Sequence, residues 1–152
     1  MKKKEEYKVV ELEVLGEIGA GQVVEFIPRN RTVPVILPVG ADESNYGTLI
    51  VRGISLENES IHDGDLLVLR KDITNKDIGR ESICAVYIRS TGELAAKKLG
   101  FGNRGDYVTL RSSGGDIEDV YYHKDDIEVR GKAVAFQRML RDDRNTDPSI
   151  PF

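Results

Sequence analysis

The chain has 152 residues, of which 39% are hydrophobic and 32% are charged, and its formal net charge is −4. This length is about that of one domain and is enough to bury a core without disulfides or metals. No segment approaches the roughly 20 continuous apolar residues of a membrane span. Acidic and basic residues are mixed along the chain, whereas a nucleic-acid surface would need a clustered basic face. We therefore expect no membrane insertion and no direct DNA binding.

Two further features of the sequence narrow the class of protein. The single cysteine, Cys84, excludes an internal disulfide and disfavours a structural zinc site. The start, MKKKEEYK, is charged and lacks the apolar region of a signal peptide. We expect a soluble cytoplasmic protein without a metal or cofactor.

Short segments rich in β-branched residues, often alternating and bounded by Gly, Asn, Asp or Pro, predict β-strands. In chain order they cover residues 7–15, 22–27, 32–37, 48–53, 65–70, 82–89, 93–99, 107–111 and 127–137. The clearest helical turn lies around residues 56–60. This pattern predicts an all-β fold with little helix, either a sandwich or a partly closed barrel. We expect a single domain over residues 7–140, with flexible segments at 1–6 and 141–152.

The stretch LGEIGAGQVVE, residues 15–25, carries three glycines directly after an apolar run. A phosphate-binding loop would need a helix after its glycines, but a strand-like run ending at Pro28 follows, and no Gly-Lys-Ser/Thr occurs. Two interpretations remain open. The glycines form a plain turn between strands, or the Ala20–Gly21 bond is offered to an active site, since small residues let an extended backbone enter a tight cleft.

The second interpretation needs a nucleophile elsewhere in the chain. Ser55 closely follows Gly53 at the end of a predicted strand, where a sharp turn can present a hydroxyl, but a serine needs a base to take its proton. His62 and Asp63 suggest a Ser-His-Asp triad, although the DGD sequence is more typical of a turn. His123 has no partner pattern and is expected at the surface.

A lysine is the alternative base, provided that burial lowers its pKa far enough to leave the amine neutral. The segment GELAAKKLGF supplies Lys97 and Lys98 among apolar neighbours. Adjacent side chains on a strand point to opposite faces, so one lysine at most can face the core and the other is expected in solvent. The alternative is that both are surface residues, with the inward amine reaching water.

Four segments in this order resemble the self-cleaving domain of the LexA repressor family, which includes the UmuD-type mutagenesis proteins and phage repressors. The resemblance runs from about Leu12 to about Phe136. VLGEIGAGQ resembles the cleavage segment, and RGISLENESIHDGDLL resembles the nucleophile segment. GELAAKKL resembles the strand of the general base, and IEVRGKAVAFQR resembles the closing strand.

The resemblance implies site residues and an activity. Ser55 would be the nucleophile, Lys97 the general base, Lys98 its outward neighbour, and the bond between Ala20 and Gly21 the one that is cut. The implied protein is a serine peptidase that cleaves itself with a Ser–Lys dyad. In the family, the RecA filament on single-stranded DNA stimulates this cleavage, and the domain forms homodimers that regulate transcription in the SOS response to DNA damage.

The sequence departs from the family pattern in several places. Leu56 replaces the usual Met after the serine, Ser60 stands where a glycine is common, and residues 80–92 form a longer segment than is typical. Only nineteen residues precede Ala20, too few for a DNA-reading helical domain, so we expect either a free-standing member like the UmuD type or a piece of a longer repressor.

Other functions therefore stay open. One is a UmuD-like accessory subunit of a translesion DNA polymerase, with cleavage only a switch or lost. A membrane signal peptidase would need an anchor that this sequence lacks, and an unrelated small β-barrel would have no chemistry.

Overall fold

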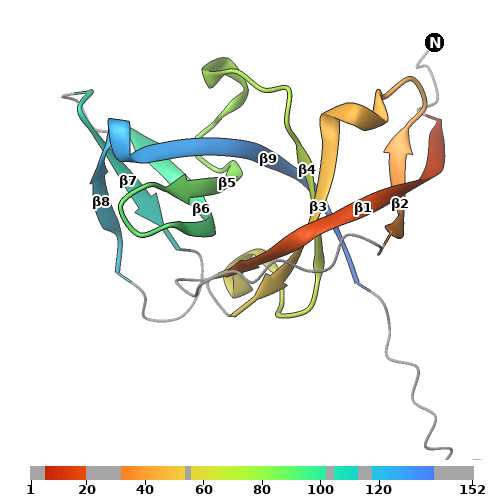
Figure 1. Ribbon diagram of the computed structural model, residues 1–152, viewed down its shortest axis with the longest axis horizontal. Coiled ribbons are helices and arrows are strands. Elements are labelled where there is room, and N and C mark those ends of the chain that lie inside the picture. The colour runs from red at the N-terminus through yellow and green to blue at the C-terminus, as the bar shows by residue number, and fades with distance from the viewer. Residues whose placement is uncertain (1–5, 20–31, 54–55, 102–104, 113–117, 139–152) are drawn as a thin grey trace, which may run out of the picture.

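A computed structural model describes residues 6–19, 32–53, 56–101, 105–112 and 118–138 (Figure 1). These residues form nine strands and four single-turn 3-10 helices. The strands are β1 (Tyr7–Gly19), β2 (Thr32–Pro38), β3 (Tyr46–Arg52), β4 (Leu66–Arg70), β5 (Ile83–Ile88), β6 (Glu93–Phe101), β7 (Tyr107–Arg111), β8 (Val120–His123) and β9 (Ile127–Gln137). The 3-10 turns are η1 (Glu43–Asn45), η2 (Glu57–Glu59), η3 (Asn75–Asp77) and η4 (Lys124–Asp126). The prediction of an all-β fold with little helix is confirmed.

The strands follow one another in a single sheet in the order β2-β1-β3-β4-β9-β5-β6-β7-β8. Neighbouring strands are antiparallel except β1 and β3, which run parallel. A further parallel contact joins Gly19 at the end of β1 to Ala95 of β6. Because β1 thereby meets both β3 and β6, the run from β1 to β6 curls around into a partly closed barrel (Figure 1).

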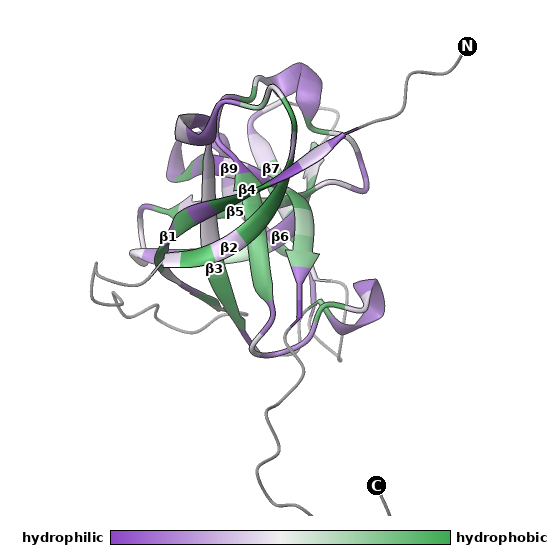
Figure 2. Ribbon diagram, turned by 90° about the vertical axis from the view of Figure 1, so that its right-hand side faces the viewer, coloured by the Kyte–Doolittle hydropathy of each residue, from purple (hydrophilic) through white to green (hydrophobic). Residues whose placement is uncertain are grey.

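Three clusters of buried side chains hold this sheet together, and Figure 2 shows hydrophobic residues along the strands with hydrophilic residues at the 3-10 turns. The first cluster draws residues from the strands of the curled run and fills its interior. The second packs β5 and β6 against β7, and the third packs β1 and β2 against β4. The core residues of the first cluster are Ile18, Leu49, Val51, Leu56, Ile61, Leu67, Leu69, Ala85 and Ala96.

The structure corrects the predicted end of the first strand. Gly16 and Gly19 belong to β1, which runs four residues beyond the predicted Leu15, so the interpretation of these two glycines as a plain turn is wrong. The reason is Ile18, which is 1% exposed and continues the alternation of buried side chains through the glycines. The pairing with β3 absorbs the irregularity as a register shift between Val14 and Gly16.

The remaining strands agree with the predicted ranges within about two residues, with two exceptions. Strand β8 was missed because it is short and largely exposed, so it lacks the buried alternation that marks a strand. The predicted strand at 22–27 lies outside the described residues, as do the predicted flexible ends apart from Glu6. The predicted helical turn at 56–60 corresponds to η2.

Ser60 ends η2 in a left-handed backbone conformation, with φ of 61°. This conformation costs a residue with a Cβ atom about 1–2 kcal/mol and costs glycine little. A serine at this point is therefore strained, which gives a physical reason for the glycine that the resemblance leads us to expect there.

We expect Ser60→Gly to raise the free energy of unfolding by about 0.5 kcal/mol or more, because relief of the strain outweighs the added freedom of the unfolded chain. Gly64 is the matched control, since it also has a positive φ of 89° and Gly64→Ala should lower stability. Urea denaturation of both variants measures the two changes. Ser60→Gly and Gly64→Ala shifting stability in the same direction would contradict this account.

Candidate active site

The end of β1 lies between two strands that are far apart in the sequence. On one side Ile18 pairs with Val51 and Gly19 pairs with Arg52, both on β3. On the other side Gly19 pairs with Ala95 of β6 (Figure 1). The predicted nucleophile segment follows β3 directly, and β6 carries the predicted base. The structure therefore brings together the flanks of the three predicted site segments.

The residues at the centre of the prediction, Ala20, Gly21 and Ser55, lie outside the described residues, but the chain is fixed on both sides of Ser55. Before it, the Gly53 N–H donates a 2.9 Å hydrogen bond to Oδ1 of Asp63. Gly53 has φ of 98°, a conformation that favours glycine. After it, Leu56 is 1% exposed and packs into the barrel core.

Residues His62 to Asp65 close this segment as a turn. The Gly64 N–H donates to the carbonyl of Val51 at 2.7 Å, and the His62 N–H donates to Asp65 at 2.8 Å. Asp65 is 2% exposed and also accepts two hydrogen bonds from Arg138, which lower the pKa of its carboxyl. Asp63 and Gly64 form a turn as the DGD sequence predicts, and the Asp63 carboxylate is engaged with the Gly53 backbone.

Lys97 is buried, with 8% of its surface exposed. Burial lowers the pKa of its amine, an effect that the nearby charge of Glu93 opposes. The Nζ atom donates a 2.6 Å hydrogen bond to Oγ of Ser112, just beyond the end of β7. Among the described residues, no carboxylate lies within ion-pair distance of this amine. Lys97 is thus a lysine that loses its proton more readily than an exposed one.

Ser112 is a polar partner that the sequence reasoning missed. The signal lies in the pairing of β6 with β7, where Lys98 stands opposite Arg111. In an antiparallel pair, one step along each strand sets Lys97 opposite Ser112. Recognising that hairpin and its register would have found the contact. The sequence RSSGG itself gives no sign of it, because its composition is that of an ordinary turn.

Lys98 differs from its neighbour in charge and surroundings. Its side chain is 11% exposed and its ammonium forms ion pairs with Glu59 of η2 and, at 2.6 Å, with Glu81. These carboxylates raise the pKa of Lys98 and keep it protonated. The expectation that this lysine is simply solvated is wrong, because it joins β6 to the turn that follows Leu56. Of the two lysines, Lys97 is chemically suited to act as a base.

Cys84 stands opposite Lys97 on β5 but is unsuited to act as a nucleophile. It is fully buried, and burial raises the pKa of its thiol to about 11, so the reactive thiolate is scarce near neutral pH. Within the described ranges, no group of three or more His, Cys, Asp or Glu side chains could hold a metal ion. No helix in the same ranges is long and apolar enough to cross a membrane.

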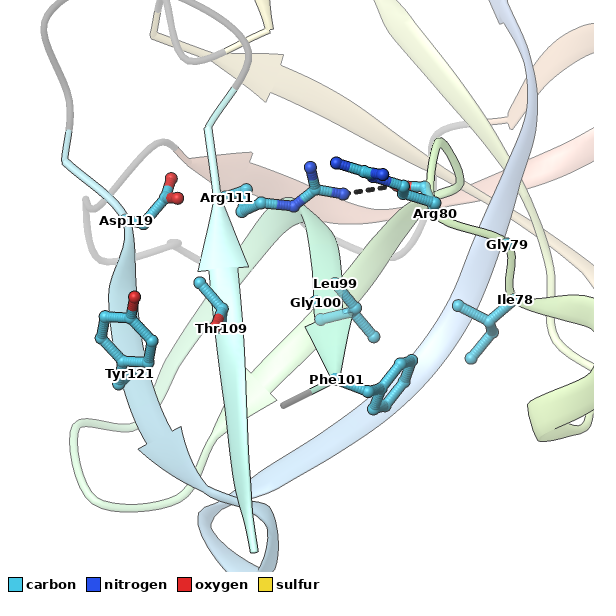
Figure 3. Close-up of a pocket in the computed structure, with 10 residues that line it drawn as sticks. All are labelled: Ile78, Gly79, Arg80, Leu99, Gly100, Phe101, Thr109, Arg111, Asp119 and Tyr121. Carbon is cyan, nitrogen blue, oxygen red and sulfur yellow. Dashed lines mark hydrogen bonds between the residues drawn. The ribbon is translucent and has the colours of Figure 1, made fainter. Parts of the chain in front are cut away.

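Two hollows in the surface differ in their relation to these residues. One, of about 830 Å³, is bordered by Arg52, by the turn at residues 62–65 and by the end of β9. The other, of about 520 Å³, lies over β6, β7 and β8, where Arg111 donates a hydrogen bond to the carbonyl of Arg80 (Figure 3). The first hollow includes Arg52 at the end of β3, and, among the residues that the structure describes, neither hollow is lined by a predicted site residue.

Comparison with known proteins finds several LexA repressors among the relatives of this chain. The chain is 32% identical over 134 residues to the LexA repressor of Herpetosiphon aurantiacus and 32% identical over 133 residues to that of Thermotoga petrophila. It is 28% identical over 132 residues to the LexA repressor of Syntrophobacter fumaroxidans. These matches cover 84–87% of this chain but about 60% of each relative. No protein-family model matches the chain.

Proposed function

We propose that this chain, a LexA-type domain by its similarity to LexA repressors, is a serine peptidase that cuts its own backbone between Ala20 and Gly21. One observation carries the proposal. Gly19, directly before that bond, pairs with both the strand that leads to Ser55 and the strand that holds Lys97.

The proposed reaction uses Lys97 as a neutral base. Its amine takes the proton from the Ser55 hydroxyl while Oγ attacks the carbonyl carbon of Ala20. Backbone N–H groups near the serine stabilise the negative charge that develops on the carbonyl oxygen. The Lys97 ammonium then returns the proton to the nitrogen of Gly21 as the peptide bond breaks. Water, activated by the same amine, hydrolyses the ester between Ser55 and Ala20.

Ser112 would position the base in this reaction. A neutral amine has two N–H groups and one lone pair, and the Ser112 oxygen accepts a hydrogen bond from one of those N–H groups. The contact restricts rotation of the Lys97 amine and leaves its lone pair free for the proton of Ser55. Ser112 therefore acts through Lys97 and does not touch the reacting bond.

The biological setting is proposed from the similarity to LexA repressors. We propose that the chain belongs to a LexA-like regulator of the SOS response, that the RecA filament on single-stranded DNA stimulates its cleavage, and that it forms homodimers. Because the substrate is tethered, the rate depends on how often the end of β1 is held between β3 and β6. A filament that favours this arrangement would accelerate cleavage without supplying any catalytic group.

Incubation of the purified chain at mildly alkaline pH should release a fragment that begins at Gly21, identified by mass. Ser55→Ala and Lys97→Ala should stay intact, while Lys98→Ala, the matched control on the neighbouring residue, should still be cut. The rate should rise with pH and level off above the pKa of Lys97, because the neutral amine is the active form. A wild-type chain that remains whole even with activated RecA filament, or a rate independent of pH, would contradict the proposal.

Ser112→Ala should lower the cleavage rate at the alkaline plateau about tenfold, because the amine loses its orientation. The midpoint of the pH profile should move to lower pH, since an oxygen acceptor favours the ammonium over the neutral amine. Ser112→Thr keeps the hydroxyl and should retain most of the rate. Thr109→Val, which removes a hydroxyl elsewhere on β7, should leave both the plateau and the midpoint unchanged.

Two results would overturn this role for Ser112. An unchanged pH profile in Ser112→Ala would show that the hydroxyl does not act on Lys97. Cleavage that is lost in Ser112→Ala but retained in Ser55→Ala would make Ser112 the nucleophile and remove Ser55 from the proposed dyad.

A further inference from the structure

The side chain of Arg52 joins the strand that precedes the proposed scissile bond to the turn that follows the proposed nucleophile. Its Nε and one terminal nitrogen donate to the same oxygen of Glu17, at 3.1 and 3.0 Å. Its other terminal nitrogen lies 3.7 Å from Oδ2 of Asp63. Oδ1 of Asp63 in turn accepts the hydrogen bond from Gly53. A chain of charges thus runs from β1 through β3 to the start of the Ser55 segment.

The sequence around the proposed bond makes Glu17 prominent. In the run from Gly16 to Gly21, GEIGAG, Glu17 and Ile18 carry the only side chains larger than a methyl group. Ile18 is buried in the barrel core, where it contributes to the fold. Glu17 is therefore the side chain by which a surface could recognise this segment as a substrate, and Arg52 is the group that binds it.

We propose that Arg52 is a specificity subsite, which selects an acidic side chain three residues before the residue that contributes the scissile carbonyl. The Glu17–Arg52 pair holds the end of β1 against β3 in the position required for cleavage. The inference rests on the proposed self-cleavage and adds to it the class of peptide that the site accepts. In this proposal Ala20 contributes the carbonyl of the bond that is cut, and Glu17 is the side chain by which Arg52 selects the segment.

The pair is partly exposed, with 28% of the Glu17 side chain and 41% of the Arg52 side chain accessible. Such pairs contribute little to the stability of a whole domain. Their effect on cleavage differs, because the pair forms when β1 lies on β3 and is lost when the segment leaves. The energy of the pair therefore shifts the equilibrium between the arrangement with β1 on β3 and the one without this contact. A shift in this equilibrium changes the observed cleavage rate.

The experiment exchanges the two charges in the 152-residue chain and follows cleavage at alkaline pH. Glu17→Arg and Arg52→Glu should each slow cleavage about tenfold, because two like charges then face each other. The double exchange Glu17→Arg with Arg52→Glu should recover part of the lost rate, because it restores opposite charges at positions 17 and 52 but sets a carboxylate at position 52 against Asp63. Arg89→Glu is the control, since it breaks another, more exposed ion pair with Glu128 far along the chain and should leave the rate unchanged.

A second readout separates this inference from the proposed function. In a Ser55→Ala background, which cannot cleave in the proposed way, hydrogen exchange of the backbone amides of residues 16–19 reports whether the end of β1 lies on β3. The single charge reversals should lose protection there, and the double exchange should regain part of it. This readout decides the inference even if the wild-type chain is never cut, a result that would refute the proposed function alone.

The inference is overturned if both single reversals keep the wild-type rate and the wild-type amide protection. It is also overturned if the double exchange stays as slow and as unprotected as the slower single variant. In that case the loss would follow from the residues themselves and not from their pairing.

Discussion

The parallel pairing at the end of β1 is the constraint on which the candidate site depends. Gly19 meets Arg52 of β3 on one side and Ala95 of β6 on the other. A single strand end thereby brings together segments separated by more than seventy residues of sequence. Without this contact β6 would not meet β1, and the curled run of strands would lose its closure. The same contact that partly closes the barrel also holds Gly19, the residue before the proposed scissile bond, beside the strand of Lys97.

Two adjacent lysines differ in burial and in the charge of their partners, and these differences give them different protonation behaviour. Both lie on β6, and neither is fully in solvent, but their partners differ. Lys98 meets two carboxylates and stays charged, which anchors η2 beside the strand. Lys97 meets a neutral hydroxyl in a buried place, and it is the burial that lowers the pKa of its amine. Among the described residues, the Lys97 amine thus has a hydrogen-bond partner without a counter-charge, an arrangement that suits the proposed role of a neutral base.

Much of the fold was predictable from the sequence because it depends on local patterns. The alternation of apolar residues locates β2, β4, β7 and β9 almost to the residue, and the DGD sequence predicts the turn at Asp63. At Gly16 and Gly19 the composition suggests a turn, and this prediction is wrong. The strand continues through both glycines because the side chain of Ile18 is buried.

The candidate site was harder to predict because its contacts are not local. Lys97 could be selected over Lys98 from the resemblance, but its burial and its contact with Ser112 depend on the packing of β6 against β7. The partners of Arg52 likewise come from a parallel pairing whose register no single segment encodes. Sequence patterns predicted the elements, whereas the pairs of charged and polar groups between elements required the structure.

The central claim is that Ser55 attacks the carbonyl of Ala20 in the same chain and forms an ester with it. Cleavage in the presence of neutral hydroxylamine tests this most directly, because hydroxylamine breaks the ester bond and leaves its nitrogen on the Ala20 carbonyl carbon. The account predicts that mass spectrometry finds the fragment of residues 1–20 as a hydroxamate, and finds no such fragment with Ser55→Ala. A fragment that always ends in an unmodified carboxyl group, whatever the hydroxylamine concentration, would contradict it.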